Sequence, residues 1–260
     1  SHKKSLGQNF LVDLKILNMI ADLGEIRSND TVLEVGPGTG NLTEIILQKN
    51  PKNIIVVEKD KNLSLILKKK FAKTVEIIND DILNYNLDIY FDKKIIVFGN
   101  LPYNISTQIL TSWIKTNNIS NFCKKFILMF QKEVADRILA DYNSKNYGRL
   151  SIISSWKMDI KKIMDINPGS FFPAPKVKST LLIFKPKHNY FKINNPKNLE
   201  HVTNIFFNQR RKMIKKPFKF LFKNYEEVAA KLSIDLKLRP QNLNNLTYYK
   251  ICSYYEKLLK

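Results

Sequence analysis

One short run of residues has the groups needed to handle an aromatic amine. Residues 99–106 read GNLPYNIS and follow an apolar run. The amide oxygen of Asn100 and the main-chain carbonyl of Leu101 can accept hydrogen bonds from the two N–H groups of an exocyclic amine. Accepting both would stabilise the sp³-like nitrogen as it attacks. Tyr103 supplies a ring on which a flipped base can stack. The alternative is a turn followed by a helix cap, because Asn and Pro both favour turns.

A second run fits a nucleoside-containing cofactor. Residues 33–40 read LEVGPGTG, and the glycines allow a sharp turn and a close approach to a ligand. Glu58 ends the next apolar run and suits two ribose hydroxyls, while Asp80 and Asp81 end the third, where a carboxylate can accept from an adenine amine. Each acid alone also fits a solvated strand end. Together they favour an adenosine-containing cofactor, and the lack of a lysine after the glycines disfavours ATP.

The elements that must position these residues alternate along the chain. Apolar runs predict strands at residues 31–35, 53–57, 75–78, 94–98, 126–130, 158–166 and 179–184. Helical spacing predicts helices at residues 13–23, 42–48, 62–71, 106–115, 132–140 and 147–156. Strands that are apolar on both faces and separated by helices predict a parallel sheet covered on both sides. Residues 99–106 would then lie at a strand end beside the glycine turn.

The pattern changes near residue 186. Beyond it the spacing predicts only helices, at residues 199–213, 217–222, 226–232 and 246–259. We therefore expect a domain of residues 1–186 followed by a small helical domain of residues 187–260. Phe206, Phe207, Phe218 and Phe220 have ordinary helical spacing and are assigned to the core of the small domain.

The charge is concentrated in the same C-terminal part. The chain has 43 Lys and Arg against 23 Asp and Glu, a formal net charge of +20. Residues 185–260 hold 17 basic and 5 acidic residues, a net of +12, and residues 1–184 hold 26 and 18, a net of +8. A coding bias toward Lys, Asn and Ile would inflate the total without any function. It does not explain the uneven distribution, which favours a nucleic-acid partner.

Five strings together resemble one enzyme family. They are QNFL (8–11), EVGPGTG (34–40), NLPY (100–103), FFPAPKV (171–177) and FNQRRK (207–212). In this order they are similar to the S-adenosylmethionine-dependent rRNA adenine N6,N6-dimethyltransferases of the KsgA type, which act on the small ribosomal subunit. The resemblance covers nearly the whole chain. It implies an α/β class I methyltransferase fold, Rossmann-like, with a seven-stranded sheet whose last strand is antiparallel, plus a small C-terminal all-α domain.

The resemblance also implies roles for individual residues. S-adenosylmethionine is expected to be the cofactor, bound by Asn9, Leu11, Gly36, Glu58, Asp81 and Asn100. The catalytic pocket is expected to use Asn100, Leu101 and Tyr103, with Phe171 stacking on the target base. Stacked Phe and Pro residues are more often core or turn, which is the alternative for Phe171. The expected product is N6,N6-dimethyladenosine at two adjacent adenosines near the 3′ end of 16S rRNA, with a role in small-subunit biogenesis.

The resemblance also implies a partner for a run of basic residues at positions 210–216, which we call the basic run. Rather than forming only a solvated helix face, five residues are expected to contact the rRNA backbone: Arg210, Arg211, Lys212, Lys215 and Lys216. Two alternatives remain open, an erythromycin-resistance type methyltransferase of large-subunit rRNA and a non-catalytic assembly factor on the same fold. We expect a monomer without a membrane segment or bound metal. The separated Cys123 and Cys252 favour a reducing cytoplasm, and the histidines receive no role.

Overall fold

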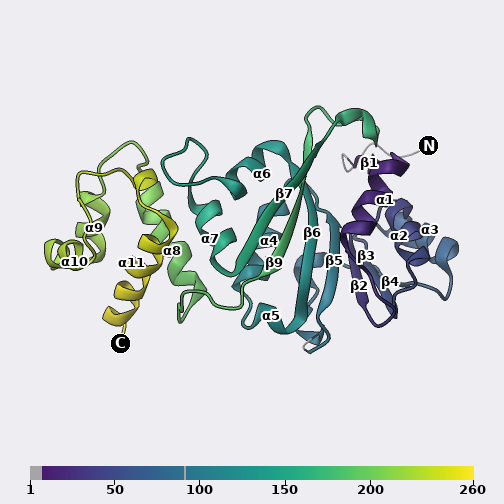
Figure 1. Cartoon of the computed structure of the whole chain (residues 1–260), viewed down its shortest axis with the longest axis horizontal. Coiled ribbons are helices and arrows are strands. Elements are labelled where there is room, and N and C mark those ends of the chain that lie inside the picture. The colour runs from purple at the N-terminus through teal and green to yellow at the C-terminus, as the bar shows by residue number, and fades with distance from the viewer. Residues whose placement is uncertain (1–7, 91) are drawn as a thin grey trace. The chain divides into compact units, whose positions relative to one another are not determined.

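The computed structural model describes residues 8–90 and 92–260, which form two compact units (Figure 1). The sheet unit comprises the described residues up to Ala135 together with Asp159–Pro186. The helical unit comprises Asp136–Met158 and Lys187–Lys260.

The sheet unit contains a seven-stranded sheet with the order β4-β3-β2-β5-β6-β9-β7. Its strands are β2 (Thr31–Val35), β3 (Asn53–Val57), β4 (Glu76–Ile78), β5 (Ile95–Asn100), β6 (Cys123–Gln131), β7 (Met158–Ile166) and β9 (Ser179–Pro186). The four strand pairs that link β4, β3, β2, β5 and β6 are parallel, whereas β9 runs antiparallel to β6. Every residue of β2 is buried, as expected for a strand covered on both faces. The predicted fold, with its antiparallel last strand, is confirmed.

Helices connect these strands, and short polar residues fix where two of them begin. The sheet unit has α1 (Leu14–Leu23), α2 (Asn41–Gln48), α3 (Lys61–Phe71), η1 (Ile82–Asn84), η2 (Leu87–Tyr90), α4 (Ser106–Lys115), α5 (Ile119–Phe122) and η3 (Pro168–Ser170), and α6 (Lys132–Leu139) begins in it. The Asp13 carboxylate accepts from the N–H groups of Lys15 and Ile16, and Asp60 caps α3 in the same way. These caps satisfy donors that have no partner within the helix.

A two-residue ladder outside the main sheet was not predicted from the sequence. Strand β1 (Phe10–Leu11) pairs antiparallel with β8 (Phe171–Phe172), so that Phe10 lies opposite Phe172 and Leu11 opposite Phe171. The N–H of Val12 extends the ladder by donating to the carbonyl of Ser170 at 2.9 Å. The ladder holds the segment before α1 against a loop about 160 residues later in the chain.

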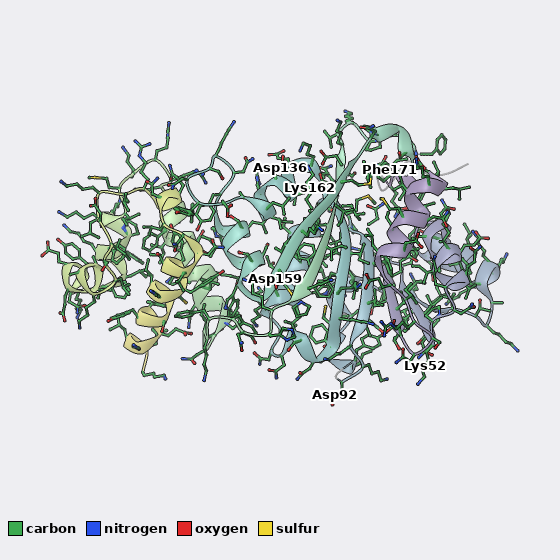
Figure 2. All side chains as sticks on the ribbon, in the orientation of Figure 1. Lys52, Asp92, Asp136, Asp159, Lys162 and Phe171 are labelled. Carbon is green, nitrogen blue, oxygen red and sulfur yellow. The ribbon has the colours of Figure 1, made fainter. Side chains whose placement is uncertain are left out.

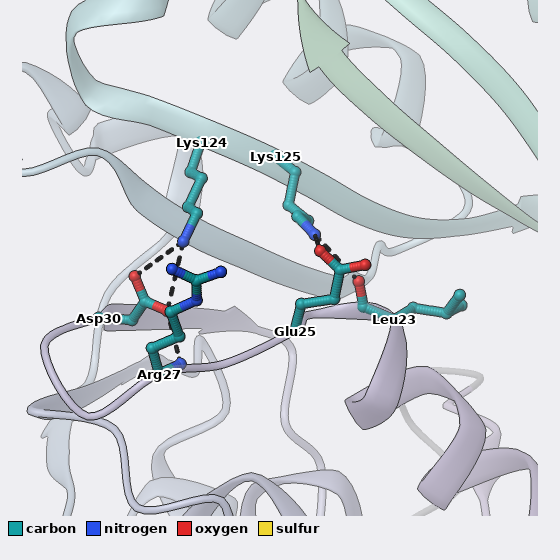
Figure 3. A network of polar contacts seen from close by, with 6 residues as sticks. All are labelled: Leu23, Glu25, Arg27, Asp30, Lys124 and Lys125. Atoms are coloured by element: carbon teal, nitrogen blue, oxygen red, sulfur yellow. Dashed lines mark hydrogen bonds and ion pairs between the residues drawn. The ribbon is translucent and has the colours of Figure 1, made fainter.

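A polar network ties the loop after α1 to the start of β6 (Figure 3). The Lys125 ammonium lies 3.2 Å from the carbonyl oxygen of Leu23 and 3.3 Å from a carboxylate oxygen of Glu25. Next to it, Lys124 pairs with Asp30 at 3.2 Å, and Asp30 also accepts from the Arg27 N–H. Because Lys125 is buried, its charge depends on these oxygens for solvation. The network therefore fixes the C-terminal end of α1.

The helical unit consists of helices around an aromatic core. Its elements are α7 (Arg149–Lys157), α8 (Pro196–Phe207), α9 (Lys215–Leu221), α10 (Tyr225–Lys231), η4 (Pro240–Asn242) and α11 (Asn245–Leu258). The ring of Phe206 lies 5.5 Å from those of both Phe218 and Tyr248, and all three side chains are buried. Such edge-to-face contacts add to the burial of apolar area.

The boundary between the two compact units differs from the single break at residue 186 that the sequence predicts. Residues 136–158 group with the later helices because several side chains bond across the sequence gap. The Tyr147 hydroxyl donates to the Leu243 carbonyl at 2.7 Å, and the Tyr249 hydroxyl donates to the Ile152 carbonyl at 2.9 Å. The helix predicted over residues 199–213 was also too long, since α8 ends at Phe207.

Several broad features of the chain can be checked on the described residues. No helix within residues 8–90 and 92–260 is long and apolar enough to cross a membrane. Among the same residues there is no cluster of His, Cys, Asp and Glu side chains that could hold a metal ion. Cys123 and Cys252 are free thiols, and burial raises the pKa of each.

Candidate cofactor pocket and catalytic loop

The glycine turn after β2 has a backbone that other residues rarely adopt. Gly36, Gly38 and Gly40 have φ angles of +64°, +59° and +87°. A Cβ atom on Gly36 would lie 2.9 Å from the main-chain oxygen of Asn100, and one on Gly38 would lie 2.5 Å from the Phe10 ring. Both the left-handed backbone and the close neighbours therefore require glycine. The turn also brings residues 33–40, predicted to bind the cofactor, against residues 99–106, predicted to bind the amine.

A pocket opens at this turn. It encloses about 510 Å³, its open mouth included, and its wall combines the glycine loop with Phe10, Leu11, Glu34 and Asn100. Leu17 and Ile20 of α1 form part of the apolar side. Three of the residues predicted to hold the cofactor, Leu11, Gly36 and Asn100, line this pocket. A largely apolar hollow with a few convergent polar groups at the carboxyl end of parallel strands is typical of ligand sites in α/β folds.

Asn100 joins the pocket to the N-terminal segment. It is the last residue of β5, it is exposed, and its side-chain nitrogen donates to the main-chain oxygen of Asn9 at 3.3 Å. Since the amide nitrogen is used in this bond, the amide oxygen is the group available to accept from a substrate. Leu101 follows with a buried side chain, so its main chain rather than its side chain is the group suited to a polar role.

Two buried carboxyl groups lie near the glycine turn: Glu34 lines the pocket, and Glu58 lies outside its lining. The Glu34 carboxyl, from β2, accepts a 2.5 Å hydrogen bond from the Thr43 hydroxyl, and burial raises its pKa to about 7, with a further contribution from Glu58. Glu58 follows β3 and accepts from the Asp60 N–H at 2.9 Å. Burial also raises the pKa of Glu58, although backbone N–H groups oppose the rise. Both carboxyls are thus held in fixed positions by local donors.

Asp81 lies at the end of the next strand in a different electrostatic environment. Its carboxylate accepts from the Leu83 N–H at 3.0 Å and pairs with Lys59 at 2.9 Å. The hydrogen bond from Lys59 lowers the pKa of Asp81, which is therefore ionised at neutral pH. A carboxylate has about four acceptor positions, so these two bonds leave capacity for further donors.

The aromatic residues differ in exposure. Tyr103 is 71% exposed, as a ring that stacks on a base must be. Phe171, labelled in Figure 2, is only 5% exposed and packs in the core of the sheet unit, whereas its neighbour Phe172 is 72% exposed. The expectation that Phe171 offers an open stacking surface therefore needs correction. The pairing of β8 with β1 turns Phe171 inward and Phe172 outward, because successive strand residues face opposite sides.

The basic run does not form one helix face. Its first three residues lie in the turn that follows α8, whereas Lys215 and Lys216 begin α9. The Arg210 guanidinium donates to three main-chain oxygens of the helical unit, those of Tyr147, Ser144 and Lys145. Arg210 is thus a structural residue rather than a free phosphate ligand, which corrects the prediction for this position. The other four predicted RNA contacts are exposed: Arg211, Lys212, Lys215 and Lys216.

Comparison with known proteins identifies the relatives of this chain. The family model described as ribosomal RNA adenine dimethylase matches residues 1–258. The chain belongs to the ribosomal RNA adenine dimethylase family. A relative from Pelagibacter ubique (strain HTCC1062), named ribosomal RNA small subunit methyltransferase A, is 56% identical over 256 residues, covering 98% of this chain and 97% of the relative. A protein with the same name from Ehrlichia ruminantium (strain Gardel) is 41% identical over 247 residues, covering 93% and 92%.

Solved structures agree with the family assignment. A dimethyladenosine transferase from Plasmodium falciparum has a TM-score of 0.79 and 26% identity, with 95% of this chain and 98% of that chain covered. The 23S rRNA methyltransferase ErmE has a TM-score of 0.71 over 95% of this chain and 100% of that chain. Its 19% identity shows a shared fold alone.

For this dimethylase family member, sequence reasoning missed several residues that line the pocket, among them Glu34 and Phe10. Glu34 stands inside the glycine string, but the string itself draws attention to the glycines rather than to the buried acid. Phe10 stands inside QNFL, and only its contact with the glycine turn, where it leaves no room for a Cβ on Gly38, reveals its place. An acid two residues before a glycine turn was the available signal for Glu34.

Proposed function

We propose that this chain transfers methyl groups from S-adenosylmethionine to N6 of two adjacent adenosines near the 3′ end of small-subunit rRNA, giving N6,N6-dimethyladenosine during small-subunit biogenesis. The observation that carries the proposal is the contact between the glycine turn and the Asn100 loop, where a Cβ on Gly36 would lie 2.9 Å from the Asn100 main-chain oxygen. A cofactor loop and an amine-accepting loop thus meet at one pocket. The name shared by the relatives supplies the small-subunit substrate.

The residues present fit the cofactor. The positive-φ turn is a cradle that any Cβ would fill, and carboxyl groups follow each of the next two strands of the sheet. Asn9, Leu11 and Gly36 would enclose the methionine part, Glu58 would accept from the ribose hydroxyls and Asp81 from the adenine amine, with Asn100 closing the site. When bound, S-adenosylmethionine supplies an electrophilic methyl group on a sulfonium.

The protein's own task is to hold and activate a weak nucleophile. The N6 lone pair of adenine is delocalised into the ring, so the amine attacks poorly on its own. The Asn100 amide oxygen and the Leu101 carbonyl accept its two N–H groups and favour the tetrahedral nitrogen that forms during attack. Tyr103, which is exposed, stacks on the target base after the base leaves its neighbours.

No side chain needs to remove a proton before the attack. The nitrogen becomes cationic as the new bond forms, and it then loses its proton readily to water. Glu34 and Glu58 are held by other donors, the Thr43 hydroxyl and the Asp60 N–H, and so serve in positioning rather than in proton transfer. The chain binds its RNA through four exposed cations, Arg211, Lys212, Lys215 and Lys216, and acts as a monomer.

The experiment uses unmodified small ribosomal subunits. The purified chain is incubated with them and with isotopically labelled S-adenosylmethionine, and the rRNA is digested and measured by mass spectrometry. Two adjacent N6,N6-dimethyladenosines near the 3′ end of the small-subunit rRNA are expected, and the Asn100→Ala variant should form them far more slowly. Methylation of large-subunit rRNA instead would support the erythromycin-resistance type activity. Binding of the subunit without any methylation would support an assembly factor.

A further inference from the structure

A phenylalanine of the helical unit lies on the surface. Phe220 lies in α9 and is 72% exposed, although its helical spacing predicts a place in the core. That expectation holds for Phe218, which is fully buried and whose ring lies 5.5 Å from that of Phe206. Phe220 is therefore not needed to fill the core.

The two faces of α9 explain this difference. The inward stripe is Ile214, Pro217, Phe218 and Leu221, which follow the spacing of one helix face and are buried or half-buried. The outward stripe is Lys215, Lys216, Lys219 and Phe220, all exposed. Lys216 precedes Phe220 by four residues, so the two side chains lie on the same face one turn apart.

The chain before and after Phe220 is basic as far as Tyr225, and the nearest acids along the chain are Glu226 and Glu227 of α10. Residues 208–225 contain seven Lys and Arg residues and no Asp or Glu. The Lys219 ammonium lies 5.2 Å from the centre of the Tyr225 ring, and Lys223 is exposed. An exposed ring amid cations matches a partner that offers both negative charge and flat aromatic faces.

We propose that Phe220 stacks on an unpaired base of the RNA while Lys216 and Lys215 contact the neighbouring phosphates. This inference rests on the proposed function. It adds a contact with a nucleobase to a surface that the sequence predicts to contact only the RNA backbone. Proteins that bind single-stranded nucleic acid combine a basic surface with aromatic stacking in this way. A base within a duplex is stacked on both sides, so the partner must be a loop, a bulge or an end.

Two other partners fit the face less well. An acidic protein surface would satisfy the lysines but gives no reason for an exposed phenyl ring among them. A lipid surface would need several apolar side chains on the outward stripe, and Phe220 is the only one in that stripe.

The test compares binding of two RNA probes by the full chain. The probes are an unstructured oligoadenylate and a fully paired RNA duplex of the same length, measured at one fixed salt concentration. Phe220→Ala should weaken oligoadenylate binding by about 5- to 150-fold and leave duplex binding nearly unchanged. Phe220→Trp should retain binding and show quenched fluorescence with the oligonucleotide, relative to the wild type. Leu246→Ala removes another exposed apolar side chain of the helical unit and serves as the matched control.

The outcomes separate this inference from the proposed function. Equal affinity of the wild type and Phe220→Ala for oligoadenylate, with weaker binding by Lys216→Ala, would overturn the stacking role and assign the ring to another partner, such as a protein. Equal losses on both probes would also overturn it, because stacking requires unpaired bases. If Phe220→Ala binds oligoadenylate more weakly than the wild type does, but the wild type does not methylate small subunits, the proposed function is overturned and the stacking role stands.

Discussion

The sheet unit and the helical unit use their lysines and arginines in different ways. In the sheet unit, cations pair with nearby acids, as in Lys59 with Asp81, Lys124 with Asp30 and Lys125 with Glu25. In the helical unit, residues 208–225 carry seven cations without a single acid. Charge in the first unit stabilises loops at the ends of the strands, whereas charge in residues 208–225 of the second is mostly available to a polyanion.

The largest effect is expected in the sheet unit, at the end of β5. Asn100→Ala removes an acceptor whose value is greatest in the transition state, so the rate should fall by about 100-fold or more with the fold intact. Single-turnover methylation measures this. Asn84→Ala, at another exposed asparagine of the same unit, should retain the wild-type rate. A near-normal rate for Asn100→Ala would refute its role as acceptor.

Glu58→Ala tests the proposed cofactor site of the sheet unit. Loss of an acceptor for the ribose hydroxyls should weaken S-adenosylmethionine binding by roughly 1.5–3 kcal/mol while RNA affinity stays the same. Calorimetry on the folded variant measures the first quantity. Glu58→Gln keeps one acceptor oxygen and should lose less. Unchanged cofactor affinity in Glu58→Ala would exclude the ribose contact.

Arg210 is the cation of the helical unit that breaks the pattern. Its guanidinium donates to the carbonyls of Tyr147, Ser144 and Lys145, so Arg210→Ala leaves the part-buried Tyr147 carbonyl and two exposed ones without this charged donor. The free energy of unfolding should fall by about 1.5–3 kcal/mol in chemical denaturation. Arg211→Ala should leave that energy unchanged, because Arg211 is exposed. Equal free energies of unfolding for both variants would contradict the structural role of Arg210 and support its role as a phosphate ligand.

Glu34 should give the sheet unit a pH dependence of stability. Its pKa rises from 4.5 to about 7 on folding, so between these values the folded state holds a proton that the unfolded state has released. The free energy of unfolding therefore falls as pH rises from 4.5 to 7. Glu34→Gln should reduce this fall by roughly 1–3 kcal/mol, measured by denaturation at several pH values. A wild-type slope in the variant would assign the pH dependence to other groups, such as Glu58.

The smallest effect is expected from a single phosphate contact. Arg211→Ala should lower the slope of log affinity against log salt by roughly 0.7–0.9, because one set of condensed counterions is no longer released. S-adenosylmethionine binding should stay the same. Titrations at several salt concentrations measure the slope, and an unchanged slope would make Arg211 a merely solvated cation.

The sheet could be predicted because its determinants are local. The apolar residues of β3 and β5 are continuous along the chain, and those of β2 are interrupted only by Glu34. Burial on both faces requires such a pattern. The glycine turn was equally visible, since the positive φ angles of Gly36 and Gly38 leave little choice of residue.

The remaining features depend on contacts between distant residues. The β1–β8 ladder has only two residue pairs, too few to produce a periodic pattern. Arg210 has the composition of a phosphate ligand, and only the folded positions of Ser144, Lys145 and Tyr147 show where its donors go. Phe218 and Phe220 differ by two positions, and the orientation of α9 decides which of them is buried.

The brevity of the β1–β8 ladder has a consequence for how the pocket is filled and emptied. Phe10 and Leu11 form one wall of the pocket. Two residue pairs, the bonds from Val12 and Asp13 to Ser170, and the side-chain bonds of Asn41 and Asn100 to the Leu11 and Asn9 carbonyls hold this segment. The free energy needed to open so short a ladder is a small fraction of that needed to unfold the sheet. Opening of this wall alone would leave β2 and β5 paired, so the proposed cofactor could be exchanged without disturbing those strands.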